Sequence, residues 1–145
     1  MADLDNVIKS LTFIKNNLTQ IAIDALKMSS DFAIKTQQSQ LLLGLNSTGK
    51  KIGTYKNKEY GKMKQQKNPS AGGSVDLYLE GNFSKGIYLD VNSENWTLSS
   101  KDEKTSDLKA KYDKNGDIFG FIPDNKAKLD EKINENFNIQ ISKIL

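Results

Sequence analysis

The N-terminal part of the chain reads, from residue 3 to residue 35, DLDNVIKSLTFIKNNLTQIAIDALKMSSDFAIK. Its apolar residues recur at alternating spacings of three and four, a pattern typical of a helix with one apolar face. This face holds two rows of side chains, with Leu4, Leu11, Leu18, Ala25 and Phe32 in one row and Val7, Ile14, Ile21 and Met28 in the other. The pattern predicts a long N-terminal helix whose N-cap is Asp3.

This helix would be about 48 Å long if it were straight, since an α-helix rises about 1.5 Å per residue. A compact chain of this size has a diameter of only about 38 Å. The helix is therefore expected to overhang its own domain or to break near Ser29-Ser30-Asp31, where a second N-cap is available. Its apolar stripe either faces the core of the same chain or packs in part against a neighbouring copy. The residues expected at such a contact between copies are Leu4, Leu11, Ile14, Leu18 and Ile21.

The stretch after this helix is predicted to be mostly loop. Gln37–Leu43 forms a short second helix on this interpretation, with Gly44 as its C-terminal stop. Lys50–Lys67 then holds seven lysines against one acidic residue, Glu59, so its net charge is +6, whereas the whole chain carries +3. We therefore predict a basic loop over residues 44–74.

A sheet is predicted over residues 75–122. Apolar and polar residues alternate in Val75–Leu79, Ile87–Val91 and Trp96–Leu98, which is typical of antiparallel strands with one buried face. Ile118–Ile122 follows a turn and is a candidate for a fourth strand. We therefore expect three to four antiparallel strands.

A C-terminal helix is predicted over residues 123–145, because Pro123 suits the first turn of a helix and Leu129, Ile133 and Phe137 share one face. We expect this helix to pack on the sheet. The chain of 145 residues is thus predicted to be one α+β domain. Its parts are a helical N-terminal part (1–43), a basic loop (44–74), a sheet region (75–122) and the C-terminal helix (123–145).

The amino-acid composition argues against most enzyme classes. The chain has no cysteine, no histidine and no arginine, and all 21 basic residues are lysine. Disulfides, thiol nucleophiles and zinc sites built on cysteine or histidine are therefore excluded, and the usual general base near neutral pH is missing. No apolar run is long enough to span a bilayer. We expect neither an enzyme nor a cofactor, and no contact with a membrane.

Two short motifs resemble ligand sites, but turns explain them more simply. Gly44–Lys51 nearly spells a phosphate-binding loop, yet Lys51 stands where that loop needs serine or threonine. Asp113–Asp117 begins like a calcium loop, yet Ile118 stands where such a loop needs glycine. Asn and Gly residues in both stretches suit tight turns. We therefore predict no metal site and no nucleotide site.

Three carboxylates, Asp76, Glu80 and Asp90, lie on or beside the predicted strands. Two of them in a cleft would suffice for acid–base chemistry. They alternate with the apolar face of the strands, however, so we place them on the solvent side of the sheet and predict no catalytic residue.

The basic segment Lys50–Lys67 is the candidate contact surface. Lysines interleaved with tyrosines can follow a nucleic-acid backbone while the rings stack on bases. The same charges also suit an acidic neighbouring subunit, or simply a solvated loop. The candidate contact residues are Lys50, Lys51, Tyr55, Lys56, Lys58, Tyr60, Lys62, Lys64 and Lys67.

The middle of the chain carries a further ordered pattern. It reads Gln40-Leu41-Leu42-Leu43-Gly44, then Gly49, Ile52-Gly53-Thr54-Tyr55, Tyr60 and Lys62, and closes with Val75-Asp76-Leu77-Tyr78-Leu79-Glu80-Gly81-Asn82-Phe83. This order resembles a family of small virion proteins of tailed bacteriophages, of the neck or tail-completion (head–tail joining) type. Glu80 stands where that family usually has threonine.

The resemblance implies a structural protein that assembles in rings between the phage head and tail. Its implied partners are other copies of itself and neighbouring neck, tail or portal proteins. Its implied location is the virion, and the host cytoplasm during assembly. The alternative is a small basic nucleic-acid-binding protein that makes non-specific DNA contacts through Lys50–Lys67.

Overall fold

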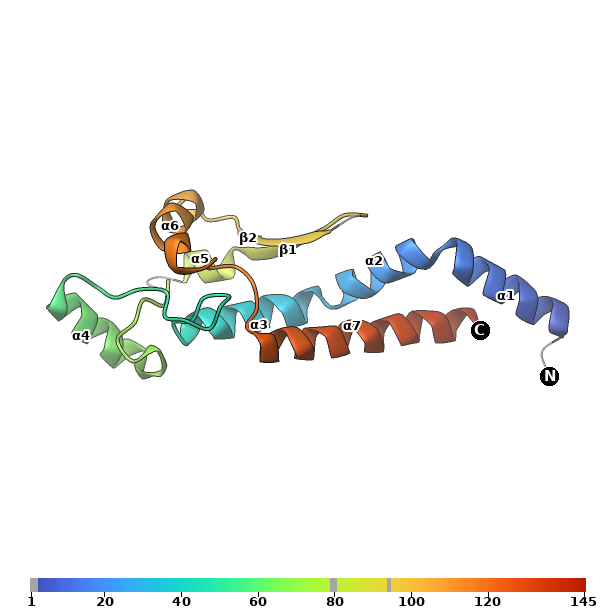
Figure 1. Ribbon diagram of the computed structural model, residues 1–145, viewed down its shortest axis with the longest axis horizontal. Coiled ribbons are helices and arrows are strands. Elements are labelled where there is room, and N and C mark those ends of the chain that lie inside the picture. Colours follow the sequence, from blue (N-terminus) through green and yellow to red (C-terminus); the bar gives the residue numbers. More distant parts are fainter. Residues whose placement is uncertain (1–2, 79–80, 94) are drawn as a thin grey trace.

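The computed structural model describes residues 3–78, 81–93 and 95–145 and shows an elongated molecule with α1 at one end and α4 at the other (Figure 1). Its helices are α1 (Leu4–Asn16), α2 (Leu18–Met28), α3 (Ser30–Leu42), α4 (Lys58–Lys67), α5 (Asn82–Lys85), α6 (Thr105–Tyr112) and α7 (Pro123–Ile144). Its strands are β1 (Ile87–Val91) and β2 (Trp96–Ser100). The predicted α+β class is confirmed.

The N-terminal helix is not continuous, because it breaks at Asn17 and at Ser29. The side-chain amide of Asn17 donates to the Phe13 carbonyl at 2.8 Å, and the Ser29 hydroxyl donates to the Ala25 carbonyl at 2.8 Å. Such bonds compete with the helical backbone for its own acceptors and bend helices. Of the two predicted alternatives, the break near Ser29-Ser30-Asp31 is present, although the Ser29 side chain does not act as an N-cap. The break at Asn17 is not predicted.

The short helix predicted at Gln37–Leu43 is the last part of α3. Gly44 follows it with a φ of +74°, so the prediction that this glycine stops the helix is confirmed. A Cβ atom at Gly44 would lie only 3.1 Å from the Cβ of Ser74. Glycine has no Cβ, so this part of the chain can approach Ser74 closely.

The predicted basic loop contains a helix, α4. Asn57 caps it, since the Asn57 side chain accepts a hydrogen bond from the Tyr60 backbone N–H at 3.0 Å. Pro69–Ala71 adds a turn of 3₁₀-helix after it. The prediction of a loop was wrong, because it rested on the polarity of a lysine-rich stretch, and polarity alone does not reveal that Asn57 is a good N-cap.

The sheet has two strands in the described residues rather than three or four. β1 and β2 form the predicted antiparallel hairpin, with Ile87 opposite Ser100 and Val91 opposite Trp96. Among its described residues, the strand predicted at Val75–Leu79 does not form, because Leu77 has a φ of +57°, a left-handed conformation outside the range of a regular strand. Leu79 itself lies outside the described residues.

The fourth predicted strand, Ile118–Ile122, does not form, because the chain bends at residues 118–120 and its backbone pairs with side chains instead of with a neighbouring strand. The Gln37 side chain accepts from the Gly120 N–H at 2.8 Å, and the Gln40 side chain accepts from the Ile122 N–H at 3.0 Å. Gln40 also donates to the Gly120 carbonyl at 2.8 Å. Two buried glutamines of α3 therefore take the place of a neighbouring strand.

The predicted C-terminal helix is confirmed as α7, but the prediction that this helix packs on the sheet is wrong. α7 lies along α2 and α3, whereas β1 packs on another side of α3 (Figure 1). Leu129 of α7 is fully buried, and the Asn136 amide donates to the Ser29 hydroxyl at 2.8 Å. The main core lies between α3, the hairpin and the segment that precedes α7. Its buried members are Leu41, Ile52, Val75, Phe83, Ile87, Leu98, Ile118 and Phe119.

Candidate functional site

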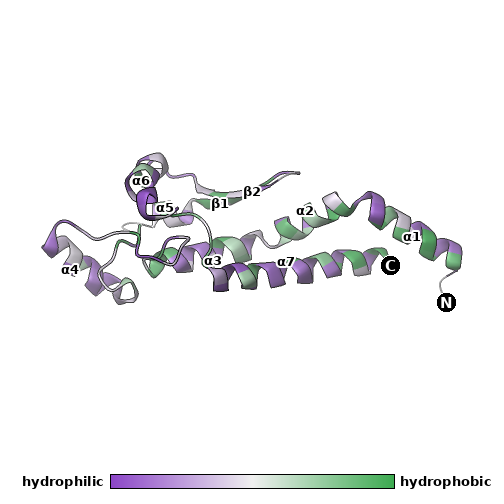
Figure 2. Cartoon of the chain, in the orientation of Figure 1, coloured by the Kyte–Doolittle hydropathy of each residue, from purple (hydrophilic) through white to green (hydrophobic). Residues whose placement is uncertain are grey.

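The basic segment begins at the turn after α3, near Ile122, and continues through the loop before α4 to α4 itself, which lies at one end of the molecule (Figure 1). α4 is hydrophilic along most of its length (Figure 2). Six of the seven lysines in this segment are exposed, namely Lys50, Lys51, Lys56, Lys58, Lys62 and Lys67. The structure therefore offers six separate positive charges along this segment.

Lys64, the seventh lysine, is buried. Its ammonium lies 2.8 Å from Asp76 Oδ1, and the two side chains are 4% and 1% exposed. Lys64 also donates to the Tyr78 carbonyl, and the second carboxylate oxygen of Asp76 accepts from the Asn68 amide at 2.9 Å. The prediction that Lys64 belongs to a contact surface is therefore wrong, as is the placement of Asp76 on the solvent side of a sheet.

The two tyrosines of the basic segment pack on each other. The ring centroids of Tyr55 and Tyr60 lie 5.1 Å apart in an edge-to-face arrangement, and both residues are half-buried. Burial raises the pKa of Tyr55 above its ordinary value, and the nearby negative charge of Asp76 raises it further. The Tyr55 hydroxyl therefore stays protonated near neutral pH, and the lysines are the most accessible part of this surface.

A pocket of about 230 Å³ lies beside this tyrosine pair. It is lined by Tyr55, Tyr60, Tyr78 and Tyr112, together with Leu77 and Leu108 among others. A dry cavity of about 150 Å³ can hold a benzene molecule, so this pocket has room for one ring or one large apolar side chain. Lys64 lines the pocket as well, but its ammonium is held by Asp76.

The stretch that resembles a phosphate-binding loop satisfies its own backbone amides. Asn46 is fully buried, and its side-chain oxygen accepts from the Thr48 N–H at 2.9 Å and from the Lys50 N–H at 3.1 Å. The Gly49 N–H donates to the Asn46 carbonyl. These three backbone amides therefore donate within the segment itself, as expected for a turn.

The stretch that resembles a calcium loop is also a turn. Asp113 Oδ1 accepts from the Ile118 N–H at 3.0 Å, which closes the turn around a short 3₁₀-helix. In the described part of the chain, no three acidic side chains gather as a set that could hold a metal ion.

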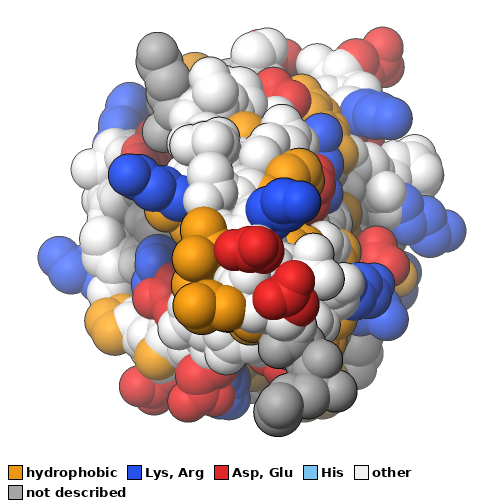
Figure 3. All heavy atoms as spheres, turned by 90° about the vertical axis from the view of Figure 1, so that its right-hand side faces the viewer, with side chains coloured by type: hydrophobic (Ala, Val, Ile, Leu, Met, Phe, Trp, Pro, Cys, Tyr) orange, Lys and Arg blue, Asp and Glu red, His pale blue; other side chains and the backbone are white. Residues whose placement is uncertain are grey.

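The other candidate surface is α1, which lies at the opposite end of the molecule and has no buried residue. The exposed fractions of its large apolar residues are 71% for Leu4, 51% for Ile8, 52% for Leu11 and 53% for Phe13. Figure 3 views the molecule from this end and shows hydrophobic side chains among acidic and basic ones.

The contact residues predicted for the N-terminal helix fall into two groups. Leu4, Leu11 and Leu18 are exposed and Ile14 is half-buried, so all four are accessible to a partner to some degree. Ile21 is only 5% exposed and belongs to the core, so its assignment to a contact between copies is wrong. The heptad pattern runs through both groups without a change, which is why the sequence does not separate them.

No family model matches this sequence, and no curated protein or solved structure matches it. No helix among the described residues combines the length and apolar character that crossing a membrane requires. The function therefore has to be inferred from the residues themselves.

Proposed function

We propose that this chain is a structural subunit of a tailed-phage virion, of the neck or tail-completion type, which acts by assembling with copies of itself and with neighbouring virion proteins. The observation that carries the proposal is α1, a helix of 13 residues with no buried side chain and a mostly exposed apolar face. Exposed apolar faces of this kind mark interaction sites. The resemblance of the stretch between Gln40 and Phe83 to phage virion proteins supplies the class of assembly.

The apolar face of α1 makes the proposal quantitative. Full burial of a leucine side chain contributes about 1.5–3 kcal/mol, and about half of Leu11 is still exposed (52%). A partner that covers Leu11 thus gains roughly 1 kcal/mol from this residue. An aspartate at the same position would also place an unpaired charge in the contact, which adds a penalty of similar or larger size.

The test is the solution mass of the protein by light scattering, at 50 and 500 mM NaCl and over a range of protein concentrations. We expect an oligomer that persists at 500 mM NaCl. Leu11→Asp should weaken it at least tenfold, because about 1.4 kcal/mol corresponds to a tenfold change in the dissociation constant. Asn6→Asp adds the same charge on the opposite side of α1 and is the matched control. A monomer under all these conditions would contradict self-assembly.

The second candidate function is non-specific binding to nucleic acid, and the six exposed lysines of the basic segment favour it. If all six contact phosphates of a duplex, affinity should fall by a factor on the order of 10³ between 50 and 200 mM salt. The test is fluorescence anisotropy with a labelled duplex of 30 base pairs. The pair of changes Lys58→Gln and Lys62→Gln should reduce both the affinity and the salt dependence.

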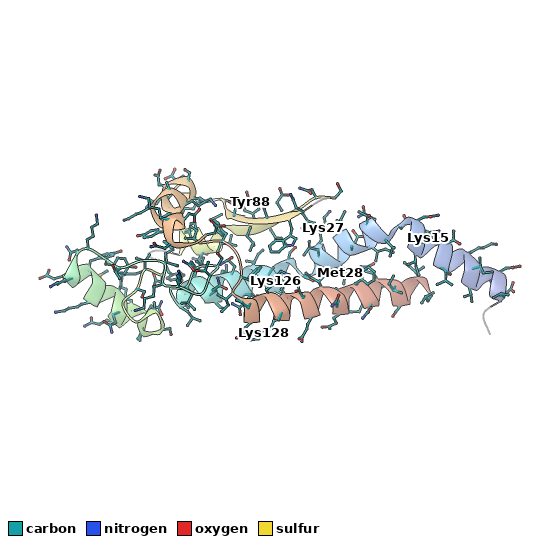
Figure 4. The ribbon with its side chains drawn as sticks, viewed as in Figure 1. Lys15, Lys27, Met28, Tyr88, Lys126 and Lys128 are labelled. Atoms are coloured by element: carbon teal, nitrogen blue, oxygen red, sulfur yellow. The ribbon has the colours of Figure 1, made fainter. Side chains whose placement is uncertain are left out.

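The control for this test changes two exposed lysines of α7, Lys128→Gln and Lys143→Gln, which alters the net charge equally at another place. Figure 4 labels Lys128 near the start of α7. Equal loss of affinity in both pairs would indicate a response to net charge alone and would contradict a binding surface on α4.

A further inference from the structure

The exposed face of α1 carries a short stripe that we call the α1 stripe, formed by Leu4, Ile8, Leu11 and Lys15. These residues follow one another at spacings of four, three and four, so they lie in one line along the helix, and all four are exposed. Figure 4 shows Lys15 on α1, far from α4. α1 contacts α2 and α7. The more buried residues Val7 and Ile14 lie beside the stripe.

The α1 stripe is complementary to itself when two copies run antiparallel. Its midpoint falls between Ile8 and Leu11, so in such a pair Ile8 of each copy lies opposite Leu11 of the other. Leu4 of each copy then lies opposite Lys15 of the other. The aliphatic stem of a lysine can cover a leucine while its ammonium remains at the edge of the contact.

The charges of α1 decide the direction of the pair. Asp3 and Asp5 stand on either side of Leu4 in the sequence, at the acidic N-terminal end of α1. An antiparallel pair therefore brings Lys15 of one copy next to Asp3 and Asp5 of the other, and it does so twice. A parallel pair would place Lys15 against Lys15 and the acidic ends against each other. Antiparallel helix dipoles also oppose each other favourably.

We infer that α1 of one copy pairs antiparallel with α1 of a second copy through the α1 stripe. This inference rests on the proposed function, because it names the first partner of the α1 face and the direction in which that partner lies. The two copies are related by a two-fold axis, since the same patch serves on both sides.

The absence of cysteine makes the direction measurable by disulfide cross-linking. A disulfide requires Cα atoms within about 7 Å of each other. In the antiparallel pair, position 4 of one copy lies opposite position 15 of the other, whereas the two copies of position 4 are about 16 Å apart along the axis. The variants are Leu4→Cys, Lys15→Cys and, as a control on the opposite side of α1, Asn6→Cys. None of these changes touches a buried residue, and circular dichroism checks that each variant is folded.

The expected result is a covalent dimer in the mixture of Leu4→Cys and Lys15→Cys, at least tenfold above the yield of either variant alone and of Asn6→Cys. Cross-linking of Leu4→Cys alone would indicate a parallel pair and overturn the inference, while self-assembly would stand. An oligomer in light scattering without any of these cross-links would place the contact elsewhere. This result too would overturn the inference while self-assembly would stand. Equal yield in all variants would indicate random collision and overturn the inference. A monomer in light scattering would overturn both proposals.

Discussion

Replacing Lys64 with methionine removes one half of the buried ion pair. Among the described residues, Asp76 would keep two neutral donors, the Asn68 amide at 2.9 Å and the Tyr78 N–H at 2.9 Å. Removing one partner of a buried ion pair destabilises a protein by about 3–5 kcal/mol. Because two hydrogen bonds to Asp76 remain, we expect the lower end, about 3 kcal/mol, against a total stability of about 5–15 kcal/mol for a typical domain.

The assay is unfolding by urea and by heat, followed by circular dichroism. A loss of about 3 kcal/mol should lower the melting temperature by roughly 6–12 °C in a chain of this length. Lys62→Met is the matched control, because Lys62 lies on the same helix and is exposed. The control should change stability by less than about 0.5 kcal/mol.

The double variant Lys64→Met, Asp76→Leu tests the reason for the loss. Once both charges are gone, no unpaired carboxylate remains in the interior, so stability should recover in large part. If Lys64→Met is no more destabilising than Lys62→Met, the reasoning is refuted. It is refuted equally if the double variant is as unstable as the two single losses added together.

Two further changes test other parts of the structure. Gln40→Leu leaves the Ile122 N–H and the Gly120 carbonyl without their side-chain partner. A fully buried group left unpaired costs about 1–3 kcal/mol. Because both of these bonds are only part-buried, urea unfolding should show a loss in the lower part of the summed range, roughly 2–4 kcal/mol, and an unchanged midpoint would contradict the role of Gln40. Tyr55 has a pKa raised above 10.0 in the folded chain. The unfolded chain therefore loses this proton first as the pH rises, and the free energy of unfolding should fall above about pH 10. Tyr55→Phe should lack this part of the loss when unfolding is compared at pH 9 and pH 11. An identical loss in both proteins would contradict the raised pKa of Tyr55.

Local patterns in the sequence predicted several elements correctly. The alternation in Ile87–Val91 and Trp96–Leu98 predicted the hairpin, because one of its faces is buried. Pro123 and the periodic apolar residues after it predicted α7 from its first residue. Gly44 predicted the end of α3, because glycine adopts a left-handed conformation without strain.

The errors share a cause, which is that long-range side-chain pairing leaves no local pattern. The alternation in Val75–Leu79 is typical of a strand, yet Asp76 turns inward because Lys64 of α4 neutralises it there. The segment Ile118–Ile122 has the composition of a strand, yet its partners are glutamine side chains more than 80 residues away. Side-chain amides can replace a strand's backbone groups as hydrogen-bond partners, and nothing in the sequence marks the two glutamines for this role.

The candidate assembly surface was predictable only in part. The heptad pattern identified Leu4, Leu11 and Leu18 as residues available to a partner, and they are exposed. It also included Ile21, a residue of α2 that is buried within the same chain. A continuous apolar stripe does not reveal which of its residues are buried by the rest of the chain, because that depends on how far α7 extends along the stripe.

The hydrogen bond between Ser29 and Asn136 joins residues 107 positions apart, and this separation has a consequence for synthesis on the ribosome. Chains are made at about 5–20 residues per second, so roughly 5–20 s pass between the appearance of these two residues. During that time α2 lacks α7, the helix that covers it. Until α7 has been made, the nascent chain therefore exposes the apolar surface of α2, and transiently exposed apolar surface of this kind makes a chain prone to aggregation.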